Sequence, residues 1–142
     1  MGGPSIPDKR WSVDLEKRIQ HEHYGQGYEE RYAFDPKSER EIFIIDTPPP
    51  YPSGTWHIGA VAQYSMIDVI ARSQRLLGKE VRFPWGVDRN GINIEFTVEK
   101  KHGRKMRTYD RLEFLKLCEE TIEPYTQAMR ETAKRVGLSC DF

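Results

Sequence analysis

The stretch that decides the fold is EIFIIDTPPPYPSGTWHIGA, residues 41–60. Its apolar run at residues 42–45 is rich in β-branched side chains, which predicts a strand buried on both faces of a parallel sheet. The three prolines at 48–50 end this strand, because proline donates no hydrogen bond to a neighbouring strand. The stretch therefore predicts a strand that leads through a stiff loop into a helix.

We expect that helix over residues 57–77 and a second strand over residues 80–83. Gly78 ends the helix in the usual C-terminal way. Helical spacing predicts its buried stripe to be Ile58, Ala62, Met66, Val69, Ile70 and Leu77. Strand, helix and strand in this order form a right-handed βαβ unit. The predicted fold is therefore α/β, the first half of a doubly wound, Rossmann-like parallel sheet.

Two further helices are expected, over residues 92–101 and from about residue 108 or 110 to Gly137. Asp110 and Glu113 have the spacing of a capping box, and Pro124 is expected to kink or split the second helix. The predicted buried side of that helix is Leu112, Leu115, Ile122, Met129, Ala133 and Val136.

The chain divides into a partly helical N-terminal arm with a loose end, residues 1–40, and the main unit, residues 41–142. Because a doubly wound sheet needs more strands, we expect a truncated fold whose exposed sheet edge is prone to association.

Composition limits the function classes. The chain has 22 lysines and arginines against 22 aspartates and glutamates, so no overall basic field indicates a nucleic-acid partner. The apolar runs are too short to span a membrane, and Cys118 and Cys140 lack the spacing of a metal or disulfide motif. We expect a cytoplasmic protein with reduced thiols, no metal site and no membrane partner. The basic run at residues 100–107 is either a solvated turn or an RNA contact.

The loop after the first strand has the chemistry of a phosphate site. Ligands of open α/β sheets bind at this edge, beyond the carboxyl ends of the strands. Gly54 and Gly59 allow a base or a phosphate to approach the backbone. The helix start near His57 offers N–H groups and a positive dipole end, and the imidazole can donate to a phosphate oxygen. Taken alone, a histidine at a helix start is more commonly a cap or a surface residue.

Residues 48–59 resemble the first signature of the class I aminoacyl-tRNA synthetases, which is His-Ile-Gly-His after a proline-rich loop. The likeness extends from about residue 32 to residue 142. The sequence FPWGVDRNGI, residues 83–92, is most similar to the valyl subgroup, and the isoleucyl subgroup remains an alternative. The second class signature, Lys-Met-Ser-Lys-Ser, is absent, and we interpret the faint match at residues 105–108 as chance.

The resemblance implies that the loop and helix start bind ATP, with Mg²⁺. Gly54, His57, Gly59 and Ala60 would line the nucleotide site, with His57 as the catalytic residue that stabilises charge on the phosphates. Ala60 stands where the signature has its second histidine, which removes one donor to the phosphates. Loss of a comparable transition-state donor costs roughly a hundredfold in rate.

The resemblance also implies an amino-acid site. Pro49 and Pro50 would wall this site, and Asp88 would bind the α-ammonium group, since a partly buried carboxylate pairs well with an ammonium. The alternative for Asp88 is an ordinary loop aspartate that caps the next helix at Gly91 or Ile92.

The implied activity is an ATP-dependent ligase that forms the adenylate of a branched aliphatic amino acid, valine first, for transfer to tRNA in the complete enzyme. The alternatives are an isoleucyl-type fragment, a small nucleotidyltransferase of the related superfamily, or an inactive ATP- or RNA-binding module.

Overall fold

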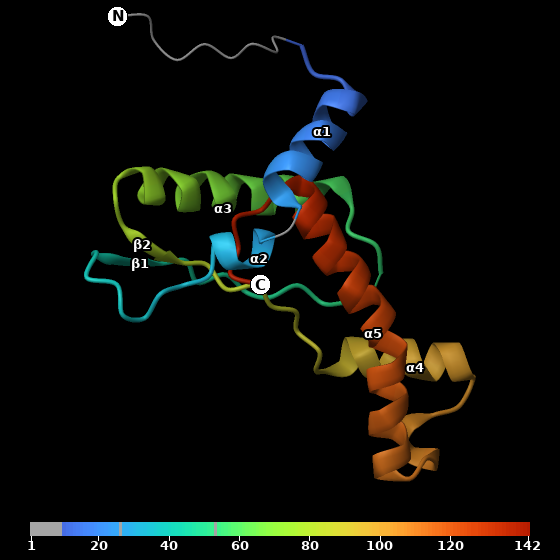
Figure 1. The fold of residues 1–142 in the computed structure, drawn as a ribbon. Coiled ribbons are helices and arrows are strands. Elements are labelled where there is room, and N and C mark those ends of the chain that lie inside the picture. Colours follow the sequence, from blue (N-terminus) through green and yellow to red (C-terminus); the bar gives the residue numbers. More distant parts are fainter. Residues whose placement is uncertain (1–9, 26, 53) are drawn as a thin grey trace, which may run out of the picture.

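The computed structural model describes residues 10–25, 27–52 and 54–142, so the expected loose end at residues 1–8 and the loop residue Ser53 lie outside the described residues. The elements are α1 (Val13–Tyr24), α2 (Tyr28–Arg31), β1 (Ile42–Ile44), α3 (Ile58–Leu76), β2 (Glu80–Arg82), α4 (Ile92–His102), the 3₁₀ turn η1 (Met106–Thr108) and α5 (Arg111–Val136) (Figure 1). The predicted α/β class is confirmed. None of the helices in the described part of the chain is long and apolar enough to cross a membrane.

The sheet is parallel. β1 and β2 lie side by side with Phe43 opposite Val81, and α3 connects them as a βαβ unit. The chain then returns after α5, where Asp141 bridges Pro84 in the parallel sense. Trp85 N donates to the Asp141 carbonyl at 2.8 Å, and Asp141 N donates to the Phe83 carbonyl at 2.7 Å. The last residues therefore extend the sheet beyond β2, an element that the sequence analysis did not assign.

The core lies between the sheet, α3 and the C-terminal segment. Its buried members are Ile45, Tyr64, Ala71, Val81, Phe83, Ala133, Leu138 and Cys140. The predicted buried stripe of α3 is wrong, because five of its six residues, Ile58, Met66, Val69, Ile70 and Leu77, are at least half exposed. The helix buries Tyr64, Asp68 and Ala71 instead. These positions also have helical spacing, but two of them are polar, so an apolar pattern could not identify them.

The prediction that β1 is buried on both faces is also wrong. Phe43 and Ile45 pack into the core, whereas Ile42 is 49% and Ile44 61% exposed. Alternate residues of a strand point to opposite faces, so one face of β1 is covered and the other is open.

α5 is one helix, and Pro124 lies inside it without splitting it. Asp110 caps its start by accepting hydrogen bonds from Leu112 N and Glu113 N, and Gly137, with φ of 83°, ends it in the left-handed conformation that favours glycine. The buried side is Phe114, Thr121, Ile122, Met129 and Ala133. The predicted Leu112, Leu115 and Val136 are exposed.

The N-terminal arm packs on the C-terminal half of α5. Glu29 of α2 forms ion pairs with Arg130 at 2.8 Å and with Lys134 at 2.6 Å, which lower the pKa of its carboxyl group. The Tyr28 hydroxyl donates to the Leu138 carbonyl. The arm therefore rests on the same segment that completes the sheet.

A buried carboxylate ties α3 to the C-terminal segment. Asp68 Oδ1 accepts hydrogen bonds from Ser139 N at 2.7 Å and from Ser139 Oγ at 2.5 Å, and Asp68 Oδ2 accepts one from Arg72 Nε at 2.7 Å. Arg75 donates to the Ser139 carbonyl at 2.9 Å. The charge of Asp68 is thus compensated and its oxygens are satisfied, as burial requires.

We expect Asp68→Asn to lower the free energy of unfolding by about 2 kcal/mol or more. The change replaces one buried acceptor oxygen of Asp68 by an NH2 group, which cannot accept the hydrogen bonds that Ser139 or Arg72 donates. A buried polar group without a matching partner costs more than the net value of an ordinary hydrogen bond. Urea unfolding followed by circular dichroism measures the change. The control is Glu131→Gln, which removes an exposed ion pair to Lys134. Equal stabilities of the two variants would contradict the assigned role of Asp68.

We expect the chain to self-associate at high concentration, because apolar side chains are exposed on the open face of β1 and on the outer side of α3, and unpaired strand edges also favour association. Sedimentation velocity at increasing concentration should show oligomers for the unaltered chain and fewer for Ile44→Lys. A cooperatively folded monomer at all concentrations would contradict this expectation.

Candidate functional site

Two loops meet at the carboxyl ends of β1 and β2. The proline-rich loop follows β1, and residues 83–91 follow β2. Asp88 N donates a hydrogen bond to the Pro50 carbonyl at 2.8 Å. A Cβ atom built on Gly86 would lie 3.9 Å from Pro49 Cβ. The structure therefore brings together the three residues that the sequence implied for an amino-acid site, Pro49, Pro50 and Asp88.

The carboxylate of Asp88 is half-buried and only partly engaged. Its Oδ1 accepts a hydrogen bond from Asn90 N at 3.0 Å, which fixes the turn of the loop. Oδ2 has no hydrogen-bond partner among the described residues. Helix α4 starts at Gly91 without a side-chain cap, so the alternative role of Asp88 as its cap is wrong. One oxygen of Asp88 remains available to a cation.

His57 is the N-cap of α3. Its Nδ1 accepts hydrogen bonds from Gly59 N at 3.1 Å and from Ala60 N at 3.4 Å. An imidazole nitrogen that accepts carries no proton, so in the neutral ring the proton resides on Nε2. The ring is exposed. His57 is thus a helix cap with an exposed ring, as is common for a histidine at a helix start. Because Nδ1 is held by the backbone, Nε2 carries the N–H that can donate to a ligand.

Gly59 has a packing role that the sequence analysis did not assign to it. A Cβ atom at this position would lie 3.0 Å from Cε1 and Nδ1 of His57, closer than carbon atoms normally approach. Glycine therefore leaves room for the imidazole over the first turn of α3. The helix start was expected to offer free N–H groups, but those of Gly59 and Ala60 are bonded to that ring. At Gly54 a Cβ atom would meet nothing within 4 Å, so packing does not explain this glycine.

A cavity of about 180 Å³ adjoins the two loops. Its lining residues are Thr47, Pro49, Tyr64, Phe83, Pro84, Trp85, Gly86 and Cys140. Burial raises the pKa of the Cys140 thiol to about 12, so this group is a neutral, apolar part of the wall. Of the residues predicted for the site, only Pro49 lines the cavity; Pro50, Asp88 and His57 do not line it.

An aromatic cluster supports this cavity. The Trp56 ring stacks on Tyr64 with centroids 4.9 Å apart and meets Trp85 at 5.4 Å. The Tyr64 hydroxyl donates to the Pro48 carbonyl at 3.2 Å, which ties α3 to the proline-rich loop. Trp56 Nε1 is buried and has no hydrogen-bond partner among residues 10–25, 27–52 and 54–142. None of these three side chains was predicted for the site, although two tryptophans flanking the predicted loops were a signal that could have identified them.

Comparison with known proteins places the chain in a family. The model of the tRNA synthetases class I (I, L, M and V) matches residues 20–142. The chain is 48% identical to the valine–tRNA ligase of Archaeoglobus fulgidus over 114 residues, which cover 80% of this chain and 13% of that protein. It is 38% identical to the valine–tRNA ligase of Aeropyrum pernix over 144 residues, covering 98% of this chain and 17% of that protein.

A solved structure agrees. The LeuRS of Agrobacterium radiobacter K84, in a ternary complex with tRNA and LeuAMS, matches with a TM-score of 0.63 and 25% identity, over 92% of this chain and 14% of that one. The chain belongs to the class I tRNA synthetase family. It spans less than a fifth of the length of these relatives.

The contact between Gly59 and His57 predicts the effect of Gly59→Ala. Replacing glycine by alanine in a helix usually stabilises it by about 1 kcal/mol. Here the added methyl group must displace the imidazole, so we expect less than that gain and a shifted NMR signal of the His57 ring. Gly54→Ala, where space is open, is the control and should leave that signal unchanged. An unaltered His57 signal in Gly59→Ala would contradict the packing role.

Proposed function

We propose that this chain carries part of the ATP and amino-acid site of a class I aminoacyl-tRNA synthetase specific for valine. The observation that carries the proposal is the junction of the two loops at the carboxyl ends of β1 and β2, with His57 at the start of α3 and Asp88 bonded to Pro50. Ligands of open parallel sheets bind at this edge. The valine–tRNA ligases of several archaea among its relatives support the choice of valine.

The amino acid would bind beside the smaller cavity. Its ammonium group would pair with the free Oδ2 of Asp88, and its aliphatic side chain would contact the apolar wall at Pro49 and Trp85. A carboxylate held by the Asn90 backbone N–H needs little reorganisation to receive a cation, which lowers the cost of binding.

The reaction would be attack of the amino-acid carboxylate on the α-phosphate of ATP, forming a carboxylate–phosphate bond and releasing pyrophosphate. His57 would donate its Nε2 proton in a hydrogen bond to a phosphate oxygen that gains charge. Its ring is fixed by two backbone N–H groups, so it is oriented before the substrate arrives. Mg²⁺ would enter with the ATP phosphates, and the remainder of the protein would supply tRNA binding and acyl transfer in the cytoplasm.

A second candidate function is an ATP-binding module without catalysis. Ala60 favours it, because the family signature has a second phosphate donor at this position. An isoleucyl-type specificity is the alternative for the amino acid.

The test is amino-acid-dependent exchange of labelled pyrophosphate into ATP by the chain. We expect exchange with valine that exceeds exchange with isoleucine. His57→Ala should lower the rate about a hundredfold, since it removes a transition-state donor. Asp88→Asn should instead raise the concentration of valine needed for half-maximal rate, because it weakens the pairing with the ammonium group.

The control is Asp110→Asn, which retains a capping residue at α5, far from the two loops in sequence. No exchange by a cooperatively folded sample would overturn adenylate formation by this chain. ATP binding in equilibrium dialysis would then establish the binding module, and its absence would overturn both functions.

A further inference from the structure

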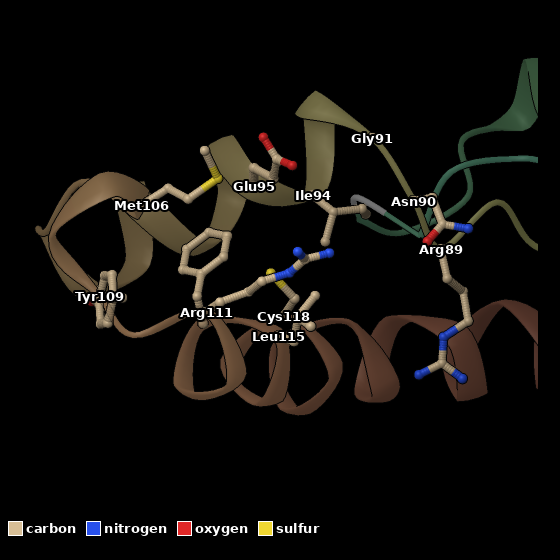
Figure 2. Close-up of a pocket in the computed structure, with 11 residues that line it drawn as sticks. Arg89, Asn90, Gly91, Ile94, Glu95, Met106, Tyr109, Arg111, Leu115 and Cys118 are labelled. Atoms are coloured by element: carbon tan, nitrogen blue, oxygen red, sulfur yellow. The ribbon is translucent and has the colours of Figure 1, made fainter.

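A second cavity, of about 420 Å³, lies between α4 and α5 (Figure 2). Its lining residues are Arg89, Asn90, Gly91, Ile94, Glu95, Met106, Tyr109, Arg111, Phe114, Leu115 and Cys118. None of the residues assigned to ATP or to the amino acid is among them. The volume falls within the usual range for small-molecule sites, roughly 300–1,000 Å³.

The wall of this cavity is mainly apolar. Ile94 and Phe114 are buried, whereas Met106 and Leu115 are about half exposed. The Tyr109 ring packs against Phe114 with centroids 5.5 Å apart. Binding of an aliphatic or aromatic group to such a surface is favourable, because it removes apolar area from water.

The charged groups of the cavity favour an anion. The guanidinium of Arg111 points into the gap between the helices, below Ile94 (Figure 2). Within the described part of the chain it forms no ion pair and no hydrogen bond. Arg89, at the other end, is held by Glu123 at 2.9 Å. The carboxylate of Glu95 points away from α5 (Figure 2) and forms no ion pair with Arg111 within the described residues, although burial and the Glu95 charge raise the pKa of the Cys118 thiol.

We propose that the cavity between α4 and α5 binds a small organic anion, with its apolar body against Ile94, Phe114 and Leu115 and its anionic group on Arg111. A guanidinium presents paired donors that match a carboxylate, sulfonate or phosphate. Arg89, Asn90 and Gly91 follow Asp88 on one loop, so this site adjoins the proposed amino-acid site without sharing its residues. The proposal is independent of the proposed catalysis.

Cys118 makes the site measurable because it lines the cavity and is partly accessible. Cys140 is fully buried and its pKa is raised to about 12, so it should not react with alkylating reagents in the folded chain. Iodoacetate and iodoacetamide alkylate the same sulfur, but only the first carries a negative charge. The ratio of their rates at Cys118, followed by peptide mass spectrometry, therefore reports the local affinity for an anion. Any effect of a variant on thiolate formation cancels in that ratio.

We expect Arg111→Gln to lower the ratio of the iodoacetate rate to the iodoacetamide rate about threefold. The effect is modest because Arg111 is exposed and water screens its charge. Arg111→Lys should retain most of the ratio. Lys116→Gln, at an exposed lysine of α5 outside the cavity, is the matched control and should leave the ratio unchanged. Added salt should reduce the difference between the unaltered chain and Arg111→Gln.

Ligand protection tests the apolar part. Millimolar 4-phenylbutyrate should slow the reaction of Cys118 with iodoacetamide, the neutral 4-phenylbutyramide should protect less, and the protection by the acid should be lost in Arg111→Gln. Equal protection by acid and amide, or none by either, would overturn the proposal, as would an unchanged rate ratio in a folded Arg111→Gln chain. Pyrophosphate exchange is a separate measurement that uses none of these reagents. A chain that shows no exchange could therefore still bind an anion between α4 and α5.

Discussion

The structure depends on one buried interaction, the binding of Ser139 by the carboxylate of Asp68. Ser139 lies just after α5, and Asp68 lies in the middle of α3, 71 residues earlier. Their hydrogen bonds hold the returning chain against α3, where Leu138 and Cys140 then fill the core and Asp141 reaches the edge of β2. The helical arm rests on the same segment through Tyr28. The Asp68–Ser139 contact thus lies where the sheet, the crossover helix and the arm come together.

The candidate site follows from that arrangement. Because β1 and β2 are parallel neighbours, the loops that follow them emerge at the same edge and meet at Pro50 and Asp88. The Tyr64 hydroxyl fixes the proline-rich loop on α3, and His57 begins that helix with its ring oriented by the backbone. His57 and Asp88 are thus held by the backbone, which suits their proposed roles as donor to a phosphate and partner of an ammonium group.

Much of this could be predicted from the sequence, because the decisive signals are local. A β-branched run, a set of prolines and a glycine after an apolar helix fixed β1, the loop and α3 to within a residue or two, and the motif residues identified the family. The buried faces could not be predicted. Tyr64 and Asp68 are buried with polar partners from other segments, Pro48 and Ser139, and an apolar pattern cannot report such partners. Ile58, Met66 and Ile44 were expected inside and lie outside, since apolar character alone does not say whether a neighbour covers a face.

The stacked aromatic rings also give the site an optical property. Trp56 and Trp85 are close enough for their excited states to interact, and Trp85 lines the smaller cavity. The third indole, Trp11, is exposed near the start of α1 and emits as a solvated ring. The blue side of the emission spectrum and the near-ultraviolet dichroism therefore arise largely from rings that border the site, so the unlabelled chain carries its own spectroscopic reporter of what occupies that cavity.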